Sequence, residues 1–243
     1  MILRRMGNKS KIAKEIQKYF PKHDIYIEPF FGAGGMFFNK PKAKYNFLND
    51  LDADVFNLFQ VVKDSKEEFI DLFEKMPIHN NLFDWWIDNE EIIPVNKAIR
   101  FVMLSNFSLY GTGYTLKLGC VKPKEMLLKN MDKTFDYLKN VQFTNCDFRK
   151  IFKSISFEKT EMPNVLIYAD PPYLNTNNNY SNSFSEKDSL DLFEMLQGSG
   201  VKWAMSEFDN PFILNEAEKR NLKNRRTEIL ITNYSIPQIK IWQ

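Results

Sequence analysis

The feature that most constrains the fold of this chain is an apolar run that ends in an acidic proline turn. Residues 165–169 read Val-Leu-Ile-Tyr-Ala, and Asp170, Pro171, Pro172 and Tyr173 follow. An unbroken apolar run is typical of a strand buried in a parallel sheet, and prolines, which have no N–H to donate, end such a strand. Asp170 is therefore expected at the carboxyl end of a central strand, where open α/β sheets bind ligands.

This acidic turn suits the recognition of an exocyclic amino group. The carboxylate of Asp170 and nearby carbonyls can accept both hydrogens of such a group, and the prolines fix these acceptors in place. Tyr173 offers a ring face on which a planar base can stack. The same residues also fit a strand end closed by a proline turn, with Asp170 as turn former and Tyr173 as packing. The rest of the chain has to separate these two interpretations.

The composition limits the possible classes of protein. A chain of 243 residues with 44% hydrophobic residues fits one large domain, or one domain with a sizeable insertion. The net charge of +2 means that any nucleic-acid binding must use a local patch. The two cysteines and two histidines argue against a disulfide framework or a metal site. No segment resembles a membrane span or a signal peptide, so we expect a cytoplasmic protein, a monomer or at most a weak dimer.

A glycine-rich turn follows the first expected strand. Residues 25–27 form this strand, residues 28–35 read Glu-Pro-Phe-Phe-Gly-Ala-Gly-Gly, and a helix is expected to begin at Met36. A strand, a glycine-rich turn and a helix form a nucleotide-type cradle, because glycine lets the backbone approach a ligand closely. The next strand ends at Asp50, where a carboxylate is placed to bind ribose hydroxyls. The alternative for Asp50 is an N-cap of the following helix.

Two further segments point to an anionic or aromatic ligand. The spacing predicts a helix over residues 6–20, with Lys9 and Lys11 in its first turn, where the helix dipole disfavours cations unless an anion is bound. Two solvated lysines are the alternative. A third strand over residues 141–144 precedes Asp147 and Phe148, which could hydrogen-bond an adenine amino group and stack on its ring.

The alternation of strands and helices fails between about residues 77 and 140. Helices are expected over residues 96–107 and 125–138, with a glycine-rich hairpin or ordered loop over residues 110–119. Basic and polar side chains in this region suit a nucleic-acid surface, although an ordinary solvated insertion is the alternative. Seven of them are candidates for contact with nucleic acid: Lys97, Arg100, Tyr110, Thr112, Tyr114, Lys117 and Lys122.

The last third of the chain again alternates strands and helices. A helix is expected from residue 184, with Ser185 as N-cap and Asp188 completing a capping box. Strands are expected over residues 201–206, 228–232 and 239–242. Together with the four earlier strands they predict an α/β fold with a doubly wound, mostly parallel, seven-stranded sheet.

Taken in order, these motifs resemble those of the alpha-group N6-adenine DNA methyltransferases, the Dam-like enzymes that use S-adenosylmethionine. Residues 7–9 are similar to the family's methionine-binding motif and residues 28–35 to its glycine-rich cofactor motif. Asn49-Asp50 is similar to its ribose-binding strand end, Asp147-Phe148 to its adenine-binding pair, and residues 170–173 to its catalytic motif. The resemblance covers nearly the whole chain.

The resemblance implies a division of the chain and a set of site residues. It implies a catalytic domain from residues 1–62 and 141–243, with a mainly helical target-recognition insertion over residues 63–140. The implied catalytic residues are Asp170, Pro171, Pro172 and Tyr173. The implied cofactor-binding residues are Met6, Lys9, Glu28, Pro29, Phe30, Gly32, Gly34, Asp50, Asp147, Phe148 and Asp170. Tyr180, in the polar loop beyond the catalytic motif, would join the seven candidates above in holding DNA.

The function implied by the resemblance is methyl transfer from S-adenosyl-L-methionine to N6 of an adenine flipped out of double-stranded DNA, without a metal. The implied partners are duplex DNA and a possible restriction endonuclease. The insertion lacks the Arg-x-Asn and Gly-x-Phe-Asn patterns of members that read GATC. The alternatives are cytosine N4 or RNA as the substrate, a DNA-binding homologue without catalysis, and a dinucleotide oxidoreductase, against which the incomplete glycine fingerprint counts.

Overall fold

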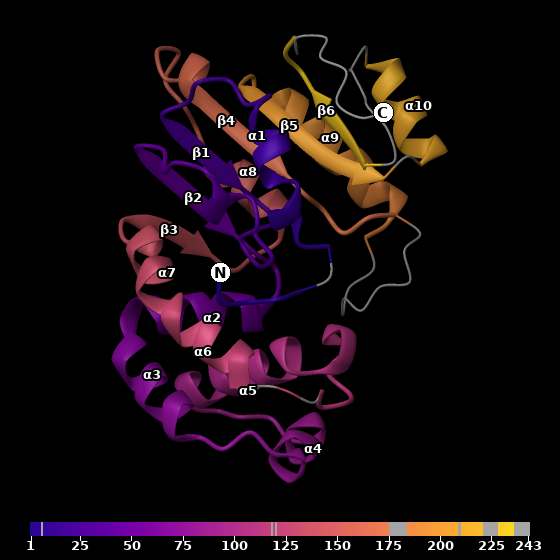
Figure 1. Ribbon diagram of the computed structural model, residues 1–243. Helices are drawn as coiled ribbons and strands as arrows, with labels where there is room; N and C mark the ends of the chain where they lie inside the picture. Colours follow the sequence, from indigo (N-terminus) through magenta and orange to yellow (C-terminus); the bar gives the residue numbers. More distant parts are fainter. Residues whose placement is uncertain are drawn as a thin grey trace.

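The computed structural model (Figure 1) describes residues 1–5, 7–117, 119, 121–174, 184–208, 210–220 and 228–235. Within these residues a six-stranded sheet runs in the order β3-β2-β1-β4-β5-β6. Its strands are β1 (Ile25–Glu28), β2 (Tyr45–Asn49), β3 (Val141–Thr144), β4 (Val165–Ala169), β5 (Lys202–Phe208) and β6 (Glu228–Thr232). Strands β1 to β5 are parallel and β6 is antiparallel to β5. The predicted α/β fold with a mostly parallel sheet is confirmed, and the strand predicted over residues 239–242 lies outside the described residues.

The centre of the sheet is the pair β1 and β4, whose residues are all buried. Ile27 of β1 lies beside Ile167 of β4. The chain builds the sheet outward on one side through β2 and β3, and then starts the other side with β4. The carboxyl ends of β1 and β4 therefore flank the point where the strand order reverses, which is where doubly wound sheets bind ligands.

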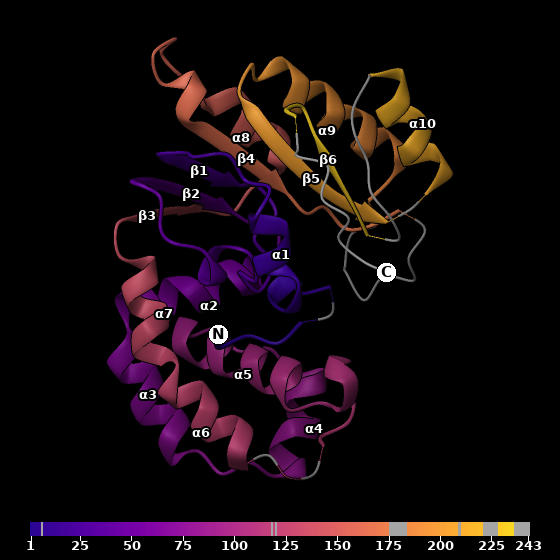
Figure 2. The same ribbon diagram turned by 45° about the horizontal axis from the view of Figure 1, so that its top comes forward.

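Helices cover both faces of the sheet, as Figures 1 and 2 show. Successive residues of β1 point to opposite faces: Ile25 and Ile27 belong to one buried cluster, and Tyr26 to another. The first cluster contains side chains of α8 (Phe148–Ser154), α9 (Glu186–Gly198) and α10 (Pro211–Lys219). The second contains side chains of α2 (Ala53–Asp64) and of the long helical segment that precedes β3.

That helical segment consists of α3 (Lys66–Lys75), α4 (Asn80–Asp88), α5 (Pro94–Asn106), α6 (Val121–Lys129) and α7 (Met131–Leu138), with the 3-10 turn η3 (Leu109–Gly111) between α5 and α6. These helices gather beyond the carboxyl ends of the strands in Figures 1 and 2. Sequence periodicity predicted one helix over residues 125–138. The helix is instead interrupted at Asn130, whose side-chain amide (2.6 Å) shares the carbonyl of Met126 with its own backbone N–H (3.2 Å).

Two other helix predictions were wrong in detail. The helix predicted over residues 6–20 is a 3-10 turn, η1 (Lys9–Lys11), followed by the short α1 (Ala13–Gln17). The helix predicted from Met36 is only the 3-10 turn η2 (Phe37–Asn39). It stops because Lys40 precedes Pro41 and takes an extended conformation, as residues before proline do. The last short turn is η4 (Met162–Asn164), which leads into β4.

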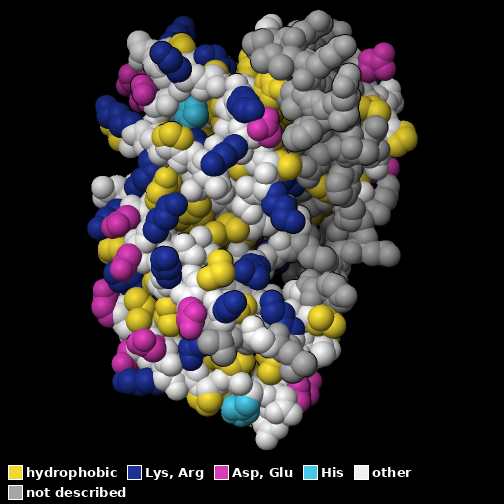
Figure 3. All heavy atoms as spheres, viewed as in Figure 1, with side chains coloured by type: hydrophobic (Ala, Val, Ile, Leu, Met, Phe, Trp, Pro, Cys, Tyr) yellow, Lys and Arg dark blue, Asp and Glu magenta, His cyan; other side chains and the backbone are white. Residues whose placement is uncertain are grey.

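The charged side chains are unevenly distributed over the surface. Lys and Arg side chains follow the middle of the face shown in Figure 3, whereas Asp and Glu side chains lie mainly along one border. A net charge of +2 therefore conceals a face with local positive character. No helix within the described residues has the length and apolar character that crossing a bilayer requires.

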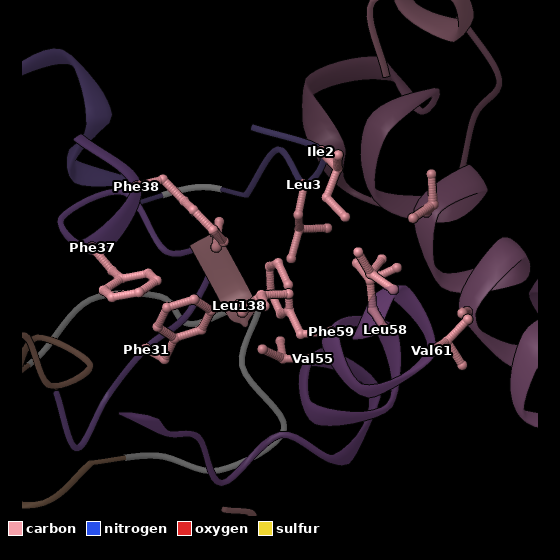
Figure 4. Close-up of a cluster of buried hydrophobic side chains, with 14 of the residues drawn as sticks. Ile2, Leu3, Phe31, Phe37, Phe38, Val55, Leu58, Phe59, Val61 and Leu138 are labelled. Carbon is pink, nitrogen blue, oxygen red and sulfur yellow. The ribbon is translucent and has the colours of Figure 1, made fainter. Parts of the chain in front are cut away.

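A single hydrophobic cluster joins the sheet to the helical segment. Figure 4 shows Ile2 and Leu3, at the start of the chain, pointing toward Leu58 and Phe59 of α2. The same buried cluster reaches Trp86 of α4. Burial of each large side chain contributes roughly 1.5–3 kcal/mol, so the N-terminal segment is an integral part of this core.

The amide of Asn106 in α5 holds that N-terminal segment. Its Oδ1 accepts a hydrogen bond from the backbone N–H of Arg4 (2.6 Å), and its Nδ2 donates to the carbonyl of Ile2 (2.7 Å). Asn106 is 8% exposed, so water cannot easily replace these bonds.

We expect Asn106→Ala to lower the free energy of unfolding by about 1–3 kcal/mol, because the buried carbonyl of Ile2 and the partly buried N–H of Arg4 lose their partner. Urea unfolding of both proteins measures the difference. Asn89→Ala is the matched control, because Asn89 donates to a carbonyl at the exposed end of α4. A loss at Asn106 no larger than that at Asn89 would contradict the assigned role.

Candidate active site

The candidate site lies where β1, β2 and β4 end. One buried amide fixes two of these strand ends relative to β3. Asn49, the last residue of β2, donates to the carbonyls of Pro29 (3.0 Å) and Cys146 (2.9 Å), and its Oδ1 accepts from Oγ1 of Thr144 (2.8 Å). Sequence reasoning named Asn49 only as the neighbour of Asp50. A buried amide at a strand end must find partners, and this requirement was the signal that could have revealed its role.

The glycine-rich turn after β1 requires glycine at two positions for different reasons. Gly32 (φ +55°) and Gly34 (φ +73°) both adopt a left-handed conformation. A Cβ on Gly34 would lie 2.4 Å from the ring of Phe38, so packing requires this glycine. A Cβ on Gly32 would meet no atom within 4 Å. Gly32 therefore borders open space, as expected of a backbone cradle that a ligand approaches closely.

Asp50 ties the glycine-rich turn to the end of β2. Its Oδ2 accepts from the N–H of Gly32 (2.5 Å) and its Oδ1 from the N–H of Asp52 (2.9 Å). Burial raises the pKa of Asp50, and these two N–H donors oppose the increase. The alternative role of Asp50 as N-cap is wrong, because Asp52 caps α2. Arg5 pairs with Asp52 at 2.6 Å and so holds the N-terminal segment beside this turn.

Lys9 and Asp170 form the central ion pair of the site. The ammonium of Lys9 lies 3.0 Å from Oδ1 of Asp170, donates to the carbonyl of Gly7 (3.2 Å) and stands 4.5 Å above the ring centre of Tyr173. The hydroxyl of Tyr173 donates to the same Oδ1 of Asp170 (3.2 Å). The alternative of two solvated lysines is wrong for Lys9, which is 4% exposed, whereas Lys11 is exposed.

Pro171 and Pro172 follow the end of β4, as predicted. Pro171 is buried and Pro172 half-buried, and the strand stops at Ala169. Tyr173 is only 9% exposed, and the ammonium of Lys9 stands over one face of its ring. The structure thus brings Asp170 and Tyr173 together with Lys9.

Glu28, at the end of β1, is a second buried acid of the site. It is 2% exposed, and its Oε2 accepts from the hydroxyl of Tyr26 (2.8 Å). Burial raises the pKa of Glu28 well above its ordinary value, the hydrogen bond from Tyr26 opposes this, and the nearby charge of Asp170 adds to it. The buried ammonium of Lys40 stands 4.2 Å from the ring centre of Tyr26, and burial lowers the pKa of Lys40 to about 8.

Phe30 and Phe148 line the other side of the strand ends. Their ring centres are 5.3 Å apart, and Phe184 packs against both, at 5.9 and 6.1 Å. Pro29, between Glu28 and Phe30, is placed by its carbonyl bond to the buried amide at the end of β2. An aromatic group of this kind suits a planar purine ring.

Asp147 caps α8 by accepting from the N–H of Arg149 (2.8 Å), and its other oxygen pairs with the guanidinium of Arg149 (3.1 Å). Arg149 also binds Asp188 and Asp191 of α9, at 2.5 and 2.7 Å. Sequence reasoning missed Arg149 because two of its three acids, Asp188 and Asp191, lie on a helix that is distant in the chain. The predicted capping box of α9, between Ser185 and Asp188, is confirmed.

Some of the candidate residues for nucleic-acid contact are exposed, and others bond to neighbouring parts of the protein. Thr112, Tyr114 and Lys122 are exposed, and Tyr114 is 74% exposed. Lys97 pairs with Asp54 at 3.1 Å.

Arg100, through its side chain, and Lys117, through its backbone, make local contacts. Nε of Arg100 donates to the carbonyl of Trp86 (2.9 Å), which ties α5 to α4. The backbone N–H of Lys117 donates to Phe107 (2.9 Å), next to the antiparallel bridge between Ser108 and Leu116. Residues Met6 and Tyr180, and the side chain of Tyr110, lie outside the described part of the structure.

The family described as D12 class N6 adenine-specific DNA methyltransferase matches residues 6–240. The chain belongs to this family. A DNA adenine methylase of Haemophilus influenzae is 29% identical over 69% of this chain and 61% of its own length, so the match spans less than two thirds of that relative. A type II methyltransferase of Lactococcus lactis subsp. cremoris is 23% identical over 94% of this chain and 93% of its own length. A DNA adenine methylase of Salmonella typhimurium is 24% identical over 97% and 81%.

A solved rRNA methyltransferase of Streptomyces viridochromogenes covers 95% of this chain and 88% of its own, with 11% identity and a TM-score of 0.45, which is a remote likeness. The resemblance inferred from the motifs is confirmed by the family match. The activity of the family is DNA adenine methylation, and its methyl donor is S-adenosylmethionine.

The site residues fit this donor. Gly32 borders open space, and the aromatic group around Phe148 suits a purine. Among the described residues no group of His, Cys, Asp and Glu side chains could hold a metal ion.

We expect the Glu28→Gln variant to become more stable than the wild type as the pH rises. The raised pKa of Glu28 means that the folded protein keeps this proton at a pH where the unfolded chain has lost it. The stability contributed by wild-type Glu28 is present at low pH and is lost as the pH rises through its folded pKa. Glutamine stays neutral and can still accept from Tyr26. Unfolding free energies should be similar at pH 4, and that of the variant higher by about 1–3 kcal/mol at pH 8.

Urea unfolding at pH 4, 6 and 8 measures this difference. Glu125→Gln, on the exposed side of α6, is the control and should shift stability equally at each pH. If the unfolding free energies of Glu28→Gln and the wild type differed by the same amount at all three pH values, the carboxyl of Glu28 would not carry its proton in the folded state.

Proposed function

We propose that this chain transfers the methyl group of S-adenosylmethionine to N6 of an adenine that is flipped out of duplex DNA, in a site between the carboxyl ends of β1 and β4. The observation that carries the proposal is the position of Asp170. It lies at the switch point of the sheet, held by Lys9 and Tyr173, opposite the glycine-rich turn.

The chemical problem is that the N6 lone pair of adenine is delocalised into the ring. Asp170 and the carbonyl of Pro171 would accept the N6 hydrogens and draw the nitrogen toward tetrahedral geometry. Bound S-adenosylmethionine would supply the methyl group of its sulfonium. N6 would form a bond to the methyl carbon, the bond between that carbon and sulfur would break, and its electron pair would stay on sulfur. The N6 proton then leaves toward Asp170 or water. Tyr173 would orient Asp170 through its hydroxyl and stack on the base with the ring face that Lys9 leaves.

We assign the remaining roles from the same geometry. The open space beside Gly32, together with Gly34, Pro29 and Phe30, would form the cradle for the donor. Asp50 would bind ribose hydroxyls. Asp147 and Phe148 would hold the donor's adenine, and Arg149 would position Asp147. Glu28 and Lys9 would interact with the methionine part of the donor.

We propose residues 63–140 as the target-recognition insertion and residues 1–62 and 141–243 as the catalytic part. The exposed Thr112, Tyr114 and Lys122 support this assignment, since they lie on the surface of the insertion, with Thr112 and Tyr114 on either side of Gly113. We further propose a cytoplasmic monomer or weak dimer. A restriction endonuclease as functional partner is suggested by the name of the type II relative from Lactococcus lactis.

Replacing Asp170 by Ala should reduce methyl transfer to DNA by roughly 10²–10³-fold or more, because the acceptor for N6 is removed. Tritium from labelled S-adenosylmethionine that enters plasmid DNA measures the rate. Mass spectrometry of the nucleosides shows whether the product is N6-methyladenine or N4-methylcytosine. Asp71→Ala, on the surface of α3, is the control. Near wild-type incorporation by the Asp170 variant would exclude the mechanism.

Lys122→Gln should weaken DNA binding at low salt and reduce the slope of log K against log salt by about one, if Lys122 contacts a phosphate. Fluorescence anisotropy with a labelled duplex between 50 and 200 mM salt gives the slope. Lys153→Gln, at the end of α8 on the opposite face of the sheet, should leave the slope unchanged. Identical slopes for all three proteins would remove Lys122 from the DNA surface.

A further inference from the structure

The ammonium of Lys9 is buried and paired inside the protein. Its side chain is 4% exposed, its Nζ lies 3.0 Å from Oδ1 of Asp170 and 3.2 Å from the carbonyl of Gly7, and it stands over the ring of Tyr173. Asp170 itself is 17% exposed. The buried cation therefore neutralises the carboxylate that the proposed mechanism needs as an acceptor.

The backbone of Lys9 is held firmly in this position. The side chain of Asn8 caps η1 by accepting from the N–H of Ser10 (2.9 Å). The turn lies directly against Gly35, where a Cβ would come within 2.1 Å of Oδ1 of Asn8 and 3.0 Å of the N–H nitrogen of Lys9. The backbone of Lys9 is therefore fixed against the glycine-rich turn, while its side chain reaches Asp170.

The proposed function gives this one ammonium two incompatible partners. An α-carboxylate bound beside the glycine-rich turn needs a cation, and Lys9 is the cation that the fold places there. Asp170 must accept hydrogens from an uncharged amino group, and a carboxylate that is paired with a buried ammonium is a weaker acceptor.

We propose that Lys9 is a positioning residue that exchanges Asp170 for the α-carboxylate of the donor. This inference rests on the proposed function of the same site. In the ligand-free protein Lys9 keeps Asp170 paired and the site electrostatically closed. A bound α-carboxylate draws the ammonium away, and Asp170 becomes available for the adenine. Donor binding therefore makes the site competent for the base.

The proposal is tested by calorimetric titration of the ligand-free protein with two probes. S-adenosylhomocysteine carries the α-carboxylate but no sulfonium charge, and 5′-methylthioadenosine lacks the whole amino-acid part. The proteins are the wild type, Asp170→Asn, Lys9→Met and the double variant. Asp170→Asn keeps the shape of the side chain and removes only its charge.

We expect Asp170→Asn to bind S-adenosylhomocysteine roughly 3- to 10-fold more tightly than the wild type, because Lys9 no longer has to leave a carboxylate. Its affinity for 5′-methylthioadenosine should not change. Lys9→Met should weaken binding of S-adenosylhomocysteine alone, and in that background the effect of Asp170→Asn should disappear, since both act through one ammonium.

Unchanged or weaker binding of S-adenosylhomocysteine by Asp170→Asn would overturn the proposal, because Asp170 would then be a support for Lys9 and not its competitor. An equal gain for both probes would also overturn it. This comparison needs only one variant, so it holds even if Lys9→Met fails to fold. Failure of the proposed function is a different result: the wild type would bind both probes but leave DNA unmethylated.

Discussion

The arrangement of the site depends on one buried amide. Asn49 bonds to the backbone after β1 and after β3 from the end of β2, so the turns that carry the functional groups cannot move independently. A buried amide that lost one of these partners would cost more than a kilocalorie per mole, which keeps the strand ends in register. The glycine-rich turn is held by its hydrogen bond to Asp50, and η1 packs against the glycine-rich turn. Each layer of the site is fixed by the one beneath it.

Several acidic side chains lie close together at these strand ends, and placing them there costs free energy of folding. Glu28 is buried and Asp50 half-buried, both have raised pKa values, and the charge of Asp170 contributes to the raised pKa of Glu28. The protein offsets this with Lys9 and Lys40, which are themselves buried. Burying so many ionisable groups together lowers stability. Function and stability are therefore opposed at the ends of β1 and β4.

The strands and their terminal residues could be predicted from the sequence, because apolar runs that stop at Asn, Asp or Pro leave few alternatives. The positions of Asp170, Asp50 and the glycine-rich turn followed from this. The helices were harder where local chemistry competes with periodicity, as at Lys40 before Pro41 and at Asn130. Partner choices were not predictable at all: a sequence does not show that Lys9 meets Asp170, or that Arg149 gathers acids from α9, because these contacts depend on how distant segments fold together.

The N-terminal segment has a consequence for how such enzymes can be recombined. Ile2 and Leu3 are buried among side chains of α2 in a cluster that reaches α4 and α5, and the same segment runs on within a few residues to η1. The part of the chain that would read the target is thus packed around residues of the N-terminal segment. A chimaera that exchanged only the middle of the chain between relatives would leave these first residues with foreign neighbours. New specificities should therefore be inherited together with the leading segment and not as a detachable cassette.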